Sequence, residues 1–184
     1  MKRLFLYLIT LAPLVYLLTR LFIIDDVNDP IKYIYTVTGA SATVIVFFSI
    51  TISLIKNKLN LMKYRKEIGL LGFFYALLHL LNFIILDAQF DFSFVIKETL
   101  DKPFIYLGMI AFFIILFMAI TSTKNLYRKY NKYHKFVYLF LILITIHWIM
   151  AQKAISILQF SYILTILVIG YYKLLQQIIN NSRS

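Results

Sequence analysis

Long apolar runs recur along this chain, and they restrict its fold more than any other feature. A helix needs about 20 predominantly apolar residues to cross the hydrocarbon core of a bilayer. The sequence contains six such runs, at roughly 4–24, 32–55, 68–86, 103–122, 135–152 and 155–175. Only 15% of the residues are charged and 61% are hydrophobic, a composition that does not suit the surface of a soluble domain. We therefore expect an all-α, polytopic membrane protein: a six-helix transmembrane bundle that forms one domain over residues 1–184.

The basic residues are divided unevenly between the two ends of these spans. With the N-terminus inside, 14 of the 19 Lys and Arg residues fall on the cytoplasmic side, and of the eight acidic residues only Glu67 does. Because an excess of Lys and Arg marks the cytoplasmic side of a membrane protein, we expect both termini in the cytoplasm. The net charge of +11 then reflects topology, and no nucleic acid partner is expected.

Two absences limit the chemistry that the chain can perform alone. It has no cysteine, which excludes disulfides, iron–sulfur clusters and thiol chemistry, so any redox chemistry needs a bound cofactor. Its five glycines form no nucleotide-binding pattern, and Gly69, Gly72 and Gly108 are interpreted as positions of close helix packing. We expect the electron source and the terminal catalyst of any redox system to be other proteins.

Two features of the spans and loops carry local predictions. Pro13 lies inside the first apolar run, where it is expected to kink the helix. The longest outer loop, at about 87–102, contains apolar residues and is expected to lie along the membrane interface or to cover an outer cavity.

The three histidines are the most informative polar residues, because ionisable groups inside a bilayer are costly and usually face the bundle interior. His79 lies eight residues before Asp87, and His147 lies six residues before Lys153. At about 1.5 Å per residue, the two imidazoles are within roughly 3 Å of one level, in the outer half of the membrane. His134 precedes His147 by 13 residues, which places it about 20 Å nearer the cytoplasmic surface.

Two imidazoles at one level on different helices suit the axial positions of a six-coordinate haem in an apolar slot. Zinc is the rival metal, but it takes four ligands, and no carboxylate or thiol lies near this depth. Either histidine could instead bond a neighbouring carbonyl or relay protons, and a small proton-coupled transporter is the alternative from a different class. From position alone, His134 is interpreted as a histidine at the edge of a solvated loop.

Five segments, taken in order, carry a family resemblance. They are DPIKYIYTVTG (29–39), RKEIGLLGFFYALLHLLNFIILD (65–87), KPFIYLG (102–108), AITSTKNLYRKY (119–130) and YHKFVYLFLILITIHW (133–148). Together they resemble the MsrQ family, also called YedZ. The resemblance implies a ferric reductase-like transmembrane domain of the bacterial inner membrane that binds at least one haem b and also FMN. By the matching motifs, His79, His147 and His134 fall on the histidines that the family associates with haem.

The resemblance also implies a role for the chain as a non-catalytic electron-transfer subunit. Electrons would come from the quinol pool or a cytosolic flavin reductase and would leave to MsrP, a periplasmic molybdopterin methionine sulfoxide reductase that repairs oxidised proteins. A ferric or oxygen reductase-type transmembrane cytochrome b is the alternative within the same superfamily.

Two positions depart from the family and its two-haem relatives. Thr36 stands where the family often has a histidine, and Arg65 stands where two-haem relatives carry a second histidine on the third helix. We therefore expect one haem on His79 and His147, and a second site on His134 that is weaker or taken by flavin, with Arg65 near haem propionates. The hydroxyls at 121–123 could meet a flavin phosphate or could cap a helix end.

Overall fold

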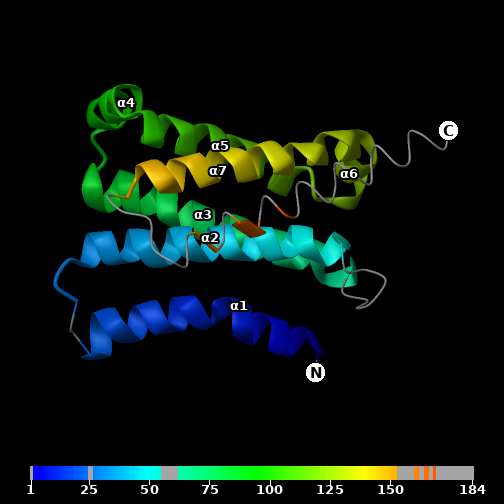
Figure 1. Ribbon diagram of the computed structural model, residues 1–184. Helices are drawn as coiled ribbons and strands as arrows, with labels where there is room; N and C mark the ends of the chain where they lie inside the picture. The colour runs from blue at the N-terminus through cyan, green and yellow to red at the C-terminus, as the bar shows by residue number, and fades with distance from the viewer. Residues whose placement is uncertain are drawn as a thin grey trace.

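The computed structural model describes residues 2–24, 27–54, 62–152 and the positions 160, 161, 164, 165 and 168. This described part of the chain is almost entirely helical and contains no strand, so the predicted all-α fold is confirmed. Its long helices lie roughly parallel in Figure 1: α1 (Lys2–Thr19), α2 (Pro30–Leu54), α3 (Arg65–Leu81), α5 (Pro103–Ile120) and α7 (Val137–Met150). The shorter segments are α4 (Phe92–Asp101), α6 (Lys124–Tyr130), the π-helical turns η1 (Arg20–Ile24) and η3 (Asn82–Asp87), and the 3₁₀ turns η2 (Met62–Tyr64) and η4 (Asn131–Phe136).

Five helical stretches of the described residues are long and apolar enough to cross a membrane. They are Arg3–Ile24, Pro30–Ile52, Met62–Asp87, Pro103–Ile120 and Lys124–Met150. These stretches correspond to the first five predicted spans, which confirms a polytopic membrane fold. The sixth predicted span, 155–175, falls outside the described residues apart from isolated positions. The count of six, the sidedness of the termini and the single-domain assignment stay predictions.

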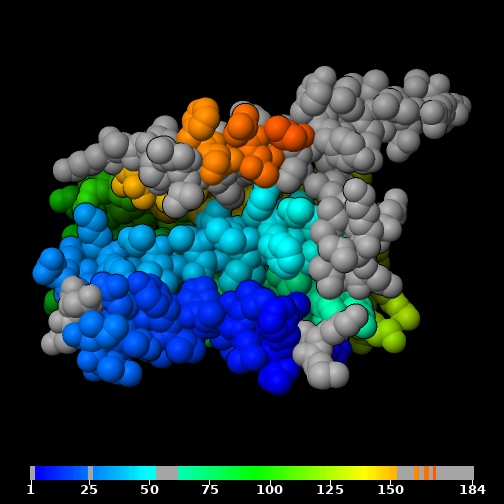
Figure 2. Space-filling view, turned by 60° about the horizontal axis from the view of Figure 1, so that its bottom comes forward, coloured from blue at the N-terminus to red at the C-terminus, as the bar shows by residue number. Residues whose placement is uncertain are grey.

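Two antiparallel helix pairs form the centre of the bundle. α2 packs along α3 and α5 packs along α7, while contacts between α3 and α5 join the two pairs. α1 is peripheral: Figure 2 shows it in blue along one side of α2 in cyan. Because α3 and α7 run in the same direction, the residues at their C-terminal ends can meet although they are far apart in sequence.

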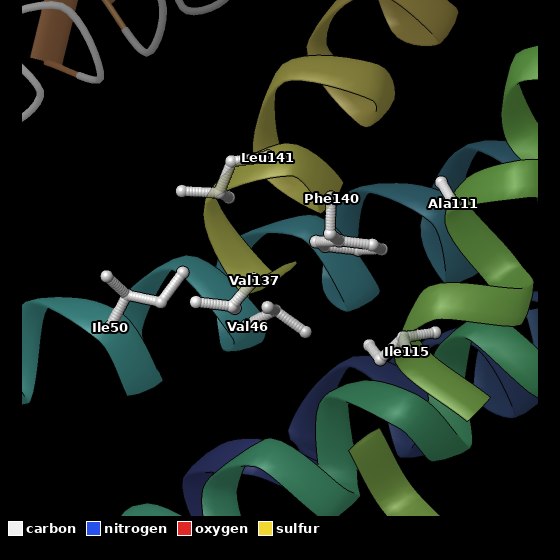
Figure 3. Packing of buried hydrophobic residues seen from close by; sticks show 7 residues of the cluster. All are labelled: Val46, Ile50, Ala111, Ile115, Val137, Phe140 and Leu141. Carbon is white, nitrogen blue, oxygen red and sulfur yellow. The ribbon is translucent and has the colours of Figure 1, made fainter. Parts of the chain in front are cut away.

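A cluster of buried apolar residues fills the space between α2, α5 and α7 (Figure 3). Its members are Val46, Ile50, Ala111, Ile115, Val137, Phe140 and Leu141. The neighbouring contact of α2 with α3 depends on Gly72, because a Cβ placed there would lie 2.5 Å from Cγ2 of Val46. Gly72 therefore holds a position of close helix packing, as interpreted from the sequence.

Pro13 opens the hydrogen-bond ladder of α1, and a side chain from α3 enters the opening. The hydroxyl of Tyr75 accepts from the backbone N–H of Leu14 at 3.2 Å and donates to the backbone carbonyl of Thr10 at 2.8 Å. In an unbroken helix that amide and that carbonyl would bond each other directly. Tyr75 is fully buried, so its hydroxyl satisfies both backbone groups where water does not reach.

The outer loop predicted at 87–102 contains a helix, α4. Its start is fixed by Asp91, whose Oδ1 accepts from the backbone N–H of Phe94 at 3.1 Å. Val95 is buried against the bundle, while three apolar residues spaced four apart stay exposed: Phe92, Ile96 and Leu100. The sequence interpretation missed this helix because ten residues are too few to register as a span.

Candidate functional site

Near one end of the bundle, the two helix pairs bring His79 and His147 together. His79 lies in the last turn of α3 and His147 in the last turn of α7. Their ring centroids are 6.2 Å apart, and the ring planes are nearly perpendicular, at 84°. The sequence placed these imidazoles at one depth, and the structure adds that they face the same space between the pairs.

The hydrogen bonds of Thr38 determine which nitrogen of His79 is free. Oγ1 of Thr38 lies 2.6 Å from the carbonyl of Ile34 and donates its only proton there. The same oxygen lies 3.3 Å from Nδ1 of His79 and must therefore accept from that nitrogen. With its proton on Nδ1, a neutral His79 presents the lone pair of Nε2.

The backbone of α5 fixes His147 in the same way. Nδ1 of His147 is 2.6 Å from the carbonyl oxygen of Phe104. A carbonyl can only accept, so Nδ1 carries the proton and Nε2 keeps its lone pair. Both imidazoles are thus held in the tautomer that a metal bound at Nε2 requires.

Each imidazole lies against a glycine of the neighbouring helix. A Cβ at Gly39 of α2 would lie 3.0 Å from Cε1 and Nδ1 of His79. A Cβ at Gly108 of α5 would lie 2.8 Å from the same atoms of His147. The two glycines therefore leave the space that the rings occupy. Gly108 is interpreted from the sequence as a position of close helix packing, and the structure shows that what packs against it is the imidazole of His147.

The donor set fits a haem iron. Iron bound by both Nε2 atoms would place the ring centroids roughly 6 Å apart, since a metal–imidazole bond is about 2 Å and the nitrogen lies about 1 Å from the ring centre. The observed separation is 6.2 Å. Zinc lacks a matching site in the described part of the chain, where no group of three or more His, Cys, Asp or Glu residues gathers. Two imidazole ligands would leave the other four positions of an iron to the nitrogens of a porphyrin.

His134 lies apart from this pair, at the opposite end of α7 in η4. Its Nε2 is 3.0 Å from Oγ1 of Thr121, and that hydroxyl donates to the carbonyl of Phe117 at 2.7 Å. Nε2 of His134 is therefore the donor, and Nδ1 carries the lone pair. The ring of Tyr127 packs edge-on at 4.9 Å. In this arrangement His134 does not present the nitrogen that His79 and His147 present.

Arg65 lies at the opposite end of α3 from His79. It starts α3, 14 residues before His79, which separates it from the outer pair by about 21 Å. The expected contact of Arg65 with haem propionates therefore stays a prediction, and it concerns a second site.

Several residues of the site were not found from the sequence. Nothing in the sequence pattern marks Thr38, Gly39 or the carbonyl of Phe104 as part of the site. The one indication is that Thr38 and Gly39 lie next to each other in one of the family-like motifs. Among the hydroxyls at 121–123, that of Thr121 donates to the carbonyl of Phe117 at 2.7 Å and that of Ser122 to the carbonyl of Met118 at 2.6 Å. These are the contacts of residues at a helix end.

Comparison with known proteins gives a family match over most of this region. Residues 39–151 match the family described as ferric reductase like transmembrane component. A protein-methionine-sulfoxide reductase heme-binding subunit MsrQ from Agrobacterium fabrum is 34% identical over 121 residues, covering 64% of this chain and 56% of the relative. MsrQ from Brucella ovis is 30% identical over 132 residues, covering 68% of this chain and 60% of the relative. The chain thus spans less than two thirds of the length of these relatives. No solved structure matches it. The predicted resemblance to MsrQ is confirmed.

Proposed function

The chain belongs to the ferric reductase-like transmembrane family, and we propose that it is a haem b-binding membrane subunit that transfers electrons. The observation that carries this proposal is the pairing of His79 with His147, 6.2 Å apart. The hydrogen bonds of both rings place the proton on Nδ1 and leave the lone pair on Nε2, the nitrogen that can bind a metal. The names of the similar proteins, heme-binding subunits of a methionine sulfoxide reductase, support the same cofactor.

The chain's own residues would hold and orient the group. His79 and His147 would bind iron from opposite faces, with Thr38 and the carbonyl of Phe104 fixing the angle and tautomer of each ring. Haem iron with two imidazole ligands supplies one-electron chemistry without an open coordination position for substrate. The apolar residues packed between the helices would keep water from the iron.

The partners follow from the resemblance to MsrQ. We propose that the chain resides in the bacterial inner membrane and accepts electrons from the quinol pool or a cytosolic flavin reductase, with FMN as a further cofactor. The electrons would leave to MsrP, a periplasmic methionine sulfoxide reductase. His134 belongs to this proposal as a ligand of an inner site, a role for which its Nε2 must release Thr121.

An absorption spectrum of the purified full-length chain tests the cofactor. We expect a Soret band, with split α and β bands after dithionite reduction.

His79→Ala and His147→Ala should each abolish the low-spin spectrum, whereas His134→Ala should keep the outer haem and lower total haem or slow its reduction. Full retention of the low-spin spectrum in His147→Ala would contradict the proposed ligand pair. Absence of any haem spectrum would favour the proton-coupled transporter.

The family description favours one second candidate, direct reduction of a ferric chelate or of oxygen. The two functions differ in the electron acceptor. Pre-reduced protein should be reoxidised rapidly by a periplasmic molybdoenzyme supplied with methionine sulfoxide, and slowly by a ferric chelate. The reverse order would assign the chain to the ferric reductases.

A further inference from the structure

An apolar hollow lies on the outside of the bundle, away from the His79–His147 pair. This cavity, of about 590 Å³, is formed by α5, α6 and η4 and is lined by Ile110, Phe113, Ile114, Phe117, Tyr130, Tyr133 and Phe136. We call it the aromatic groove. Its volume is within the range of ligand-binding cavities, about 300–1,000 Å³. Phe113 and Phe136 on its wall are 58% and 47% exposed, so the groove opens to the surroundings of the bundle.

The walls of the groove are mutually packed rings. Phe117 meets Tyr130 and Tyr133 edge-on, with centroids 6.1 and 6.3 Å apart, and Tyr133 stacks on Phe136 at 6.0 Å. The groove follows the half of α5 that leads to η4, where the predicted topology places the inner membrane surface. A slot of this kind, open to lipid and running along a spanning helix, suits a hydrocarbon chain.

Two ammonium groups lie at the η4 end of the groove. Nζ of Lys129 is 5.2 Å from the ring centroid of Tyr130, and Nζ of Lys132 is 5.0 Å from that of Tyr133. Both tyrosines line the groove, so the lysine stems lie along its rim. Residues 119–136 contain no acidic side chain to neutralise them. The rim is therefore positive where the groove meets the membrane surface.

We propose that the aromatic groove binds an anionic phospholipid, with one acyl chain along the aromatic walls and the phosphate against Lys129 and Lys132. The charge of the rim selects the headgroup, because neighbouring cations at a membrane surface favour anionic over zwitterionic lipids. This site is separate from the electron-transfer proposal and does not depend on it.

Native mass spectrometry of the full-length chain tests the site, with phosphatidylglycerol and phosphatidylcholine of equal chain length competing in one detergent. The natural chain should retain the anionic lipid in preference. Lys129→Gln with Lys132→Gln should reduce that preference by about fivefold for each lysine. Phe113→Ser, which changes an exposed wall residue, should weaken retention of both lipids, since it removes the surface that the acyl chain covers.

A matched pair separates the groove from general surface charge. The double variant Lys63→Gln with Lys124→Gln removes as much positive charge as Lys129→Gln with Lys132→Gln. Nζ of Lys63 also lies over a tyrosine ring, 5.0 Å from the centroid of Tyr64, but Tyr64 does not line the groove. This control should keep the natural preference. An equal loss of the preference for the anionic lipid in both double variants would overturn the site. So would a quinone that displaces phosphatidylglycerol and phosphatidylcholine equally well. Circular dichroism checks that each variant keeps its helix content.

Discussion

At the scale of single residues, the two imidazoles of the outer pair are held by different kinds of partner. His147 donates to a main-chain carbonyl, which no substitution removes. His79 donates to the side-chain hydroxyl of Thr38, which a substitution can remove. The two ligands can therefore be perturbed independently, and Thr38 is the residue through which His79 is adjusted.

Replacing Thr38 by Val keeps the shape of the side chain and removes the acceptor for Nδ1 of His79. An imidazole without this partner is a weaker electron donor, so we expect a higher haem midpoint potential and roughly 10- to 100-fold weaker haem retention. Redox titration and electron paramagnetic resonance measure the effect. Thr38→Ser, which keeps the hydroxyl, should restore the natural values, and an unchanged potential in Thr38→Val would refute the role.

A methyl group at Gly108 tests the space beside His147. Its Cβ would lie 2.8 Å from the imidazole, closer than packed atoms approach, so Gly108→Ala should displace the ring and remove the low-spin haem spectrum. Gly69→Ala is the control, because a Cβ there meets only Oγ of Ser49 at 3.5 Å, an ordinary contact. Similar spectra from both variants would show that the ring position tolerates the methyl group.

The sequence permits prediction of this site only in part. The common depth of His79 and His147 follows from counting residues to the span ends, because the rise of a helix is constant. Thr38 could not be found this way. Which residue of α2 meets His79 depends on the rotation and sliding of α2 against α3, and these are set by contacts such as that of Gly72 with Val46.

At the scale of elements, α1 is a peripheral helix that is attached to α3 by specific side-chain contacts. Its N-terminal end is linked to α3 by the ion pair of Arg3 with Glu67, at 3.1 Å. Since both partners are partly exposed, this pair contributes little to stability. The buried bonds of Tyr75 are the stronger link, because they satisfy backbone groups that would otherwise have no partner.

Tyr75→Phe removes that hydroxyl and leaves the N–H of Leu14 and the carbonyl of Thr10 unsatisfied. We expect a loss of about 1–3 kcal/mol in the free energy of unfolding. Tyr7→Phe is the control, because the Tyr7 hydroxyl is bonded to Glu67 at an exposed position, 3.3 Å away, and its loss should cost less than about 0.5 kcal/mol. Unfolding titrations in mixed micelles compare the two, and equal losses would rule out the special role of Tyr75.

Spans and short elements differ in how well a sequence predicts them. The first five apolar runs correspond to observed spanning stretches because length and hydropathy alone define them. Neither the π-helical turn η3 nor α4 could be predicted. The first depends on packing beside the buried Asn82, and the second is an amphipathic helix of only ten residues.

At the scale of the whole molecule, polar groups are separated by depth. One end of the bundle holds the His79–His147 pair, the opposite end holds His134 with Thr121, and the apolar cluster around Phe140 lies between them. The direction of the helices produces this separation, because α3 and α7 both run toward the end that holds His79 and His147. Their pairing with α2 and α5 was not predictable from hydropathy, which identifies spans but not neighbours.

The absence of cysteine allows a direct test of sidedness. Single cysteines at Ser93 in α4 and at Thr123 before α6 would be the only thiols in their variants, and both positions are exposed. A maleimide that cannot cross membranes should label Ser93→Cys in spheroplasts and Thr123→Cys only after permeabilisation. The opposite pattern would reverse the topology predicted from the basic residues.

The bridge from Tyr75 to α1 also sets an order of events during synthesis. Thr10 and Leu14 precede Tyr75 by 65 and 61 residues, so α1 leaves the ribosome well before α3 exists. Until α3 is inserted, the amide and carbonyl at the proline break need water or an insertion factor as a partner. α1 therefore cannot complete its packing before α3 is inserted, and we expect a nascent chain halted before Tyr75 to keep α1 near the hydrated channel of the insertion machinery.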